Sequence, residues 1–234
     1  TLTHQSRSPA ALREICAGYP DVETGGLLGC RGDAYRPQEA LTRAEAARFH
    51  AAQAAALAAA APDFLFAATL PAAGEALGMA EAMAGTGLPY LLSFIVGRDG
   101  ALLDGTPLEE AIARIDREVT PAPRGYFINC AHPSAMARAM ERTAIAARAR
   151  VLGYQGNTSA RAPAEREGLP ELDTEDPETF AAAVLQLARR FGLRVLGGCC
   201  GTDRRHLRAI ARGLHITAAG SASGVKVNPP LPAS

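Results

Sequence analysis

The adjacent cysteines Cys199 and Cys200 are the residues of this sequence whose types and spacing point most directly to chemistry. They follow an apolar run, 193–196, and precede an amphipathic segment, 203–214, so we expect them where a strand gives way to a helix. Neighbouring cysteines are poor disulfide partners for each other, but both thiols can face one metal ion. The flanking glycines let the backbone fold tightly, and a helix N-terminus favours a thiolate. The alternative is a tight turn that contains two small buried residues.

A third thiol, Cys130, ends a second apolar run, 125–130. If both runs are parallel strands of one barrel, their carboxyl ends share the face on which such barrels build active sites. Three thiolates from two strand ends predict a zinc site with one open position, as in catalytic zinc centres. His132 is a competing ligand, and its participation would make the site structural. An iron–sulfur cluster is disfavoured because it usually takes four cysteines, and Cys16 and Cys30 lie outside any cluster motif.

These motifs resemble those of the homocysteine S-methyltransferase family. The resemblance is carried by Asn129-Cys130, followed far along the chain by the segment 197–202, Gly-Gly-Cys-Cys-Gly-Thr. The segment 104–108, Asp-Gly-Thr-Pro-Leu, is similar to the family's loop after the fifth strand, and 1–5 is similar to the end of its second strand. The likeness covers nearly the whole chain.

The resemblance implies a methyltransferase in which zinc, bound by Cys130, Cys199 and Cys200, takes the thiol of homocysteine as its fourth ligand. The thiolate would displace a methyl group from a sulfonium or similar donor and give methionine. S-methylmethionine, adenosylmethionine, betaine and a methylcobalamin partner all remain open as donors. We assign Asn129 and Asn157 to substrate binding, with a plain turn residue as the alternative for Asn157.

Two departures from the family pattern leave a second function open. The family's fourth strand ends with a glutamate that receives the amino group of homocysteine, and the matching residue here is Ala68. Asp33 is a candidate to compensate. We also expect the first two βα units of the family, with an acidic glycine-rich motif that helps to hold homocysteine, to be missing. The alternative function is therefore a catalytically degenerate zinc- or thiol-binding barrel.

Alternating strands and helices must position these residues. Six strands are predicted to begin near residues 26, 64, 90, 126, 151 and 194, with helical segments between them. This alternation predicts a parallel sheet, and we expect an α/β fold of the TIM (β/α)8 type with about six βα units present. Residues 1–234 are predicted to form one domain, N-terminally incomplete, with 215–234 as a loose tail.

Several helix boundaries carry clear signals. Thr42 and Glu45 predict a capping box at the start of a long alanine-rich helix, and Asp176 is predicted to cap the helix 178–191. Met79 and Met83, spaced i and i+4, are assigned to core packing rather than to a cofactor.

The amino-acid composition limits which classes of partner we expect. The 24 basic and 24 acidic side chains balance, which argues against nucleic acid or an anionic membrane and favours a small-molecule thiol acceptor and methyl donor. No apolar run approaches the roughly 20 residues of a membrane-spanning helix. Five cysteines, an odd number, indicate reduced thiols, and we expect a cytoplasmic protein. The oligomeric state stays open.

Overall fold

The computed structural model describes residues 21–161 and 173–220, together with positions 11, 14–19, 165, 170 and 171; side chains are described up to 214. The strand end expected at 1–5 lies outside the described residues. So does the end of the chain from 221.

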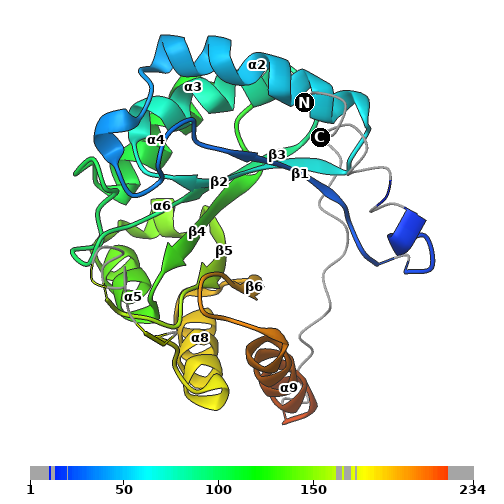
Figure 1. Ribbon diagram of the computed structural model, residues 1–234, viewed down its shortest axis with the longest axis vertical. Helices are drawn as coiled ribbons and strands as arrows, with labels where there is room; N and C mark the ends of the chain where they lie inside the picture. The colour runs from blue at the N-terminus through cyan, green and yellow to red at the C-terminus, as the bar shows by residue number, and fades with distance from the viewer. Residues whose placement is uncertain are drawn as a thin grey trace.

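Six parallel strands form one curled sheet in the order β1-β2-β3-β4-β5-β6 (Figure 1). They are β1 (Gly25–Gly29), β2 (Phe64–Leu70), β3 (Tyr90–Phe94), β4 (Gly125–Ala131), β5 (Val151–Gly156) and β6 (Val195–Gly198). All six predicted strands are present, and the sheet is part of a TIM-type α/β barrel. Leu27 on β1 and Val195 on β6 are exposed at its two edges, because the sheet does not close within the part of the chain that the structure describes.

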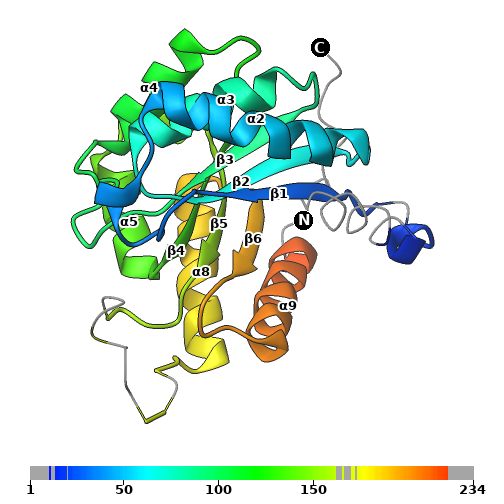
Figure 2. The ribbon, with the colours of Figure 1, turned by 45° about the horizontal axis from the view of Figure 1, so that its top comes forward.

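Helices follow the strands and cover the outer side of the sheet (Figures 1 and 2). They are α2 (Arg43–Ala59), α3 (Ala73–Ala84), α4 (Leu108–Glu118), α5 (Pro133–Arg142), α6 (Ile145–Arg148), α8 (Pro177–Phe191) and α9 (Arg204–Gly220), with a short 3-10 helix η1 (Pro37–Glu39). α2 packs on α3, and α8 packs on α9. α9 extends past Leu214, where we expected the loose tail to begin. Among the described helices, none is both long and apolar enough to cross a membrane.

Capping hydrogen bonds confirm the two predicted helix starts. Thr42 and Glu45 form a reciprocal capping box at the start of α2. The Asp176 carboxylate accepts hydrogen bonds from the backbone N–H groups of Glu178 and Thr179, both at 3.1 Å, at the start of α8. Since these caps satisfy N–H groups that the helices themselves leave open, they explain why both helices begin where they do.

The motif at 104–107 also has a structural role. Asp104 accepts hydrogen bonds from the backbone N–H of Ala73 at 2.8 Å and of Thr106 at 2.9 Å. One carboxylate thus caps α3 and forms the turn that leads into α4. Gly105 has φ 86°, a left-handed conformation that glycine adopts without strain.

The core lies between the sheet and the helices and includes Met79 and Met83, both fully buried as expected. It also contains a polar pair that the sequence analysis did not predict. His50 of α2 and Glu75 of α3 are both fully buried, with Nε2 and Oε1 3.1 Å apart. Glu75 also accepts backbone N–H groups from Arg31 and Leu41, so it fixes both ends of the loop between β1 and α2.

Candidate metal centre

Cys130, Cys199 and Cys200 come together at the carboxyl ends of the strands, as the sequence predicts. Cys130 lies in β4, and the other two follow β6 directly. The Sγ atom of Cys130 is 2.6 Å from that of Cys199 and 3.9 Å from that of Cys200. All three sulfurs lie within 4.8 Å of one another, and in the described part of the chain no other group of three or more His, Cys, Asp or Glu side chains converges in this way.

The cluster opens toward solvent on one side. Cys130 and Cys199 are partly buried, whereas Cys200 is exposed. Three sulfur donors with an accessible side are what a zinc ion with one exchangeable position requires. In tetrahedral thiolate coordination the sulfurs are about 3.8 Å apart. The spacing of Cys130 and Cys200 matches this value, and Cys130 and Cys199 would have to separate by about 1 Å. The donor set therefore fits zinc.

A β-bulge directs Cys130 into the cluster. In the pairing of β4 with β5, Asn129 lies opposite Gln155 and Ala131 opposite Gly156, so Cys130 is an extra residue. Its φ is 53°, which is unusual for a residue other than glycine. Bulges of this kind occur beside active sites, where they re-aim a side chain.

The double-cysteine loop is held by one hydrogen bond to β5 and one within the loop. Cys199 donates its N–H to the carbonyl of Gly156 at 2.8 Å, and the Thr202 hydroxyl donates to the carbonyl of Cys199 at 2.7 Å. Gly201 has φ 80° and packs against Thr158 so closely that a Cβ would lie 2.0 Å from that hydroxyl oxygen. The glycines of this motif therefore allow the tight loop that presents both thiols.

Asn157 connects the two halves of the cluster. Its Nδ2 donates to the carbonyl of Cys130 at 2.9 Å, and its Oδ1 accepts the N–H of Cys200 at 3.0 Å. The residue is 3% exposed. The side chain expected to bind substrate thus contacts the backbone of two metal-ligand candidates.

Asn129 is also buried, and its side-chain oxygen faces neighbouring strands. Oδ1 accepts the N–H of Thr69 at 3.0 Å and the hydroxyl of Ser93 at 2.6 Å. Its assignment to substrate binding stays a prediction. Sequence reasoning missed the role of Ser93, although a serine within the apolar run 89–96 was a signal that could have found it.

His132 does not join the cluster. Its Nδ1 accepts the N–H of Ser134 at 3.2 Å and caps α5, while Nε2 lies 3.9 Å from a carboxylate oxygen of Glu175. Burial lowers the pKa of His132, and Glu175 opposes this only in part. With one nitrogen used as a cap, His132 gives no support to a four-ligand structural site.

Proximity of the thiols governs their protonation when no ion is bound. Hydrogen bonds with Cys199 and Cys200, followed by burial, raise the pKa of Cys130 far above its usual value. The pKa of Cys199 is also raised, because Cys200 and burial outweigh the lowering effect of its hydrogen bond with Cys130. Two neighbouring thiols with raised pKa values form a site in which a bound cation would stabilise the thiolates.

Other residues named from the sequence lie outside this centre. Asp33 is exposed and turns to its own loop, where it accepts the N–H of Tyr35 and pairs with Arg36. Cys30 donates to the carbonyl of Gly32, and burial and the nearby Glu75 raise its pKa to about 11. Ala68 lies near the end of β2, partly buried.

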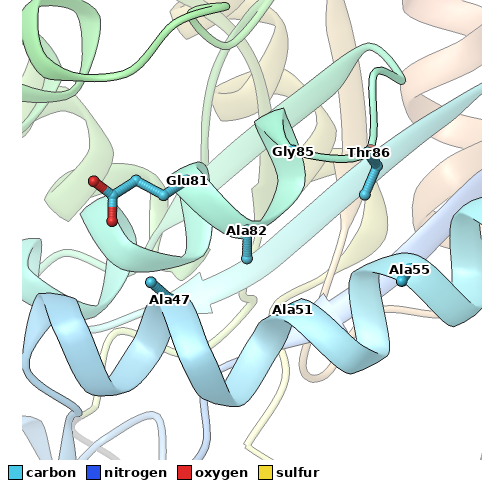
Figure 3. Close-up of a pocket in the computed structure, with 7 residues that line it drawn as sticks. All are labelled: Ala47, Ala51, Ala55, Glu81, Ala82, Gly85 and Thr86. Carbon is cyan, nitrogen blue, oxygen red and sulfur yellow. The ribbon is translucent and has the colours of Figure 1, made fainter.

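A hollow of about 320 Å3 lies between α2 and α3 (Figure 3). Alanines of α2 line it together with Glu81, Ala82, Gly85 and Thr86. Glu81 forms an ion pair with Arg43, so the residues that line the hollow do not form a candidate catalytic site.

Comparisons with family models and with solved structures both found matches. The family model described as homocysteine S-methyltransferase matches residues 6–214. Among curated proteins there is no match. Among solved structures, the homocysteine methyltransferase MmuM from Escherichia coli is similar in its oxidized form, with TM-score 0.67, 22% identity and coverage of 87% of this chain and 66% of that chain.

Two further structures of the same enzyme are also similar. The metallated form gives TM-score 0.65, 22% identity and coverage of 87% and 66%; the apo form gives 0.63, 21%, 89% and 75%. This chain therefore spans 66% of the length of two of these relatives, and at such identity the likeness concerns the fold. The family itself follows from the model match, which covers most of the chain: this chain belongs to the homocysteine S-methyltransferase family.

Proposed function

We propose that the protein containing this chain transfers a methyl group from a sulfonium or similar donor to the thiol of homocysteine, using zinc held by Cys130, Cys199 and Cys200. The observation that carries the proposal is the convergence of three sulfurs on one accessible face at the carboxyl ends of β4 and β6. Membership of the family and the metallated form of the E. coli relative support it.

Bound zinc would supply a cation that lowers the pKa of an incoming thiol and keeps it a thiolate at neutral pH. The chain's own residues provide the three anionic sulfurs and leave the side of Cys200 open for the acceptor. The acceptor sulfur would then attack the methyl carbon. As that bond forms, the bond between the methyl group and the donor breaks, and the electron pair leaves with the donor.

The first experiment is metal analysis of the whole protein, expressed and kept reduced. We expect about one zinc per chain in the parent and much less in Cys200→Ser. Cys16→Ser, a cysteine outside the cluster, is the matched control and should keep its zinc. A well-folded, reduced parent without zinc would overturn the proposal.

Activity is the second step. Zinc-loaded whole protein would be given homocysteine with each candidate donor, and the formation of methionine measured. Transfer from one donor, lost in Cys200→Ser and kept in Cys16→Ser, is the result expected. Zinc binding without transfer from any donor would instead favour the degenerate barrel.

Ala68 is the observation that favours that second candidate, because the resemblance places a glutamate for the acceptor's amino group at this position. Within the same assay, Ala68→Glu tests whether the amino group of the acceptor lies beside this position. If the acceptor is homocysteine, the variant should lower KM for it, because a partly buried carboxylate would pair with the ammonium group. An unchanged KM for homocysteine would show that its amino group does not bind beside this position. The cytoplasmic location and the single-domain organisation stay predictions.

A further inference from the structure

The bulge at Cys130 leaves a backbone group that its neighbouring strand does not satisfy. An extra residue in a ladder is unpaired, and at Cys130 this residue also has a left-handed φ of 53°. Such a conformation is unfavourable for a residue other than glycine and persists only where surrounding contacts hold it. Some other group must therefore fix the peptide of Cys130.

Asn157 is that group. Its Nδ2 donates to the carbonyl of Cys130 at 2.9 Å, and its backbone N–H donates to the carbonyl of Ala131 at 2.9 Å. Asn157 thus holds the bulge at two successive peptides. Without the bulge, the alternation of side chains along β4 would turn the thiol toward the opposite face of the sheet.

The same side chain reaches the other half of the cluster. Oδ1 accepts the N–H of Cys200 at 3.0 Å, and the N–H of the next residue, Thr158, donates to the carbonyl of Cys200 at 3.2 Å. Asn157 follows β5, which lies between β4 and β6 in the sheet. One amide group therefore spans the two strand ends that carry the thiols, and its donor and its acceptor are both in use.

We propose that Asn157 is a positioning residue of the metal centre: it fixes the distance between Cys130 and the pair Cys199–Cys200 and thereby sets the metal affinity. The role in substrate binding that the sequence indicated for Asn157 stays a prediction. The proposal rests on the proposed function for the identity of the metal, but the positioning itself is testable without metal.

The test uses whole, reduced protein and compares Asn157→Ala with Thr158→Val. Thr158 is adjacent and buried to the same extent, and its hydroxyl has no hydrogen-bond partner, so valine removes a polar atom without removing a bond. We expect Asn157→Ala to bind zinc about 10- to 100-fold more weakly, as outer-sphere changes usually do, and Thr158→Val to bind within about twofold of the parent.

Cobalt(II) substitution separates positioning from general stability. In folded Asn157→Ala, sulfur-to-cobalt absorption should fall toward that of a two-thiolate site, because Cys130 is no longer held in place. If Asn157 only stabilised the fold, the folded variant would keep the parent spectrum and zinc affinity, and the proposal would be wrong. Asn157→Asp covers the case in which alanine does not fold: it retains the acceptor for Cys200 and loses the donor to Cys130, so the spectrum should change in the same direction.

A metal-free measurement keeps this inference distinct from the proposed function. Equilibration with reduced and oxidized glutathione measures how readily Cys130 forms a disulfide with Cys199 or Cys200: two thiols lose two protons and two electrons, and one glutathione disulfide becomes two glutathione molecules. We expect an equilibrium constant about tenfold lower in Asn157→Ala than in the parent and in Thr158→Val. If the parent does not bind zinc, the proposed function is wrong but the positioning role is not affected. If the disulfide equilibrium constants of all three proteins are equal, the positioning role is wrong.

Discussion

The side-chain oxygen of Asn129 accepts a hydrogen bond from the backbone N–H of Thr69 at 3.0 Å, across 60 residues of sequence. Thr69 lies in the bulge of β2, between Ala67 and Leu70, and has φ 56°. The pair repeats, on β2, the arrangement in which Asn157 holds the bulge of β4. The bulges of β2 and β4 are thus held by asparagine side chains, that of Asn129 in β4 and that of Asn157 directly after β5.

Replacing Asn129 should therefore cost stability. Asn129→Ala leaves the N–H of Thr69 and the hydroxyl of Ser93 without their acceptor, and we expect the free energy of unfolding to fall by about 1–3 kcal/mol. Urea denaturation measures this change in the free energy of unfolding. Ser93→Ala removes one donor and leaves the acceptor paired with Thr69, so it should cost less. Equal losses in the two variants would show that the bond to Thr69 contributes nothing.

Zinc should stabilise the fold through the three cysteines. Because an ion that binds only the folded state adds RT ln(1 + [L]/Kd), zinc at 1,000 times its Kd should add about 4 kcal/mol to the free energy of unfolding. Thermal unfolding with and without a chelator checks this. Cys16→Ser should respond as the parent does, and Cys200→Ser should respond much less. A shift of the same size in both variants would place the bound zinc elsewhere.

Asp104 should behave as a helix cap rather than as a substrate ligand. Asp104→Ala frees the N–H groups of Ala73 and Thr106, and we expect a loss of about 1 kcal/mol in the free energy of unfolding. Asp104→Asn keeps an acceptor oxygen and should recover part of that loss. In the methyl-transfer assay, both folded variants should keep the KM of the parent for acceptor and donor. A large rise in KM with unchanged stability would contradict this role.

Glu75 should make stability depend on pH in acid. Burial opposes its charge, but hydrogen bonds from His50 and from the N–H groups of Arg31 and Leu41 outweigh burial, so the pKa of Glu75 lies below its usual 4.5. On acidification the unfolded chain therefore takes up this proton first. The stabilisation is complete above about pH 4.5 and is lost as the pH falls through the lower pKa of the folded state.

The variant that tests this relation is Glu75→Gln. It should be less stable than the parent at pH 7 by about 1–3 kcal/mol and should lose less stability below pH 4.5. Unfolding in urea at a series of pH values measures both. Glu110, an exposed carboxylate on α4, gives the control variant Glu110→Gln, which should follow the parent. Parallel curves for the parent and Glu75→Gln would remove Glu75 from the acid dependence.

The sequence by itself determined the order and type of the elements and the three candidate ligands. Apolar runs separated by helical segments are local patterns, and capping residues such as Thr42 and Asp176 satisfy N–H groups in their own vicinity, so both can be read without the fold. Cys130, Cys199 and Cys200 could be grouped because parallel strands bring their carboxyl ends to one edge.

Tertiary structure alone decided how those residues are held. Both side-chain hydrogen bonds of Asn157 reach residues 27 and 43 positions away, and no local pattern encodes partners at that distance. The bulges at Thr69 and Cys130 likewise arise from the register between strands, which depends on the neighbouring strand as much as on the residue itself. His50, one of many residues on an alanine-rich helix, became half of a buried pair only because α3 places Glu75 against it.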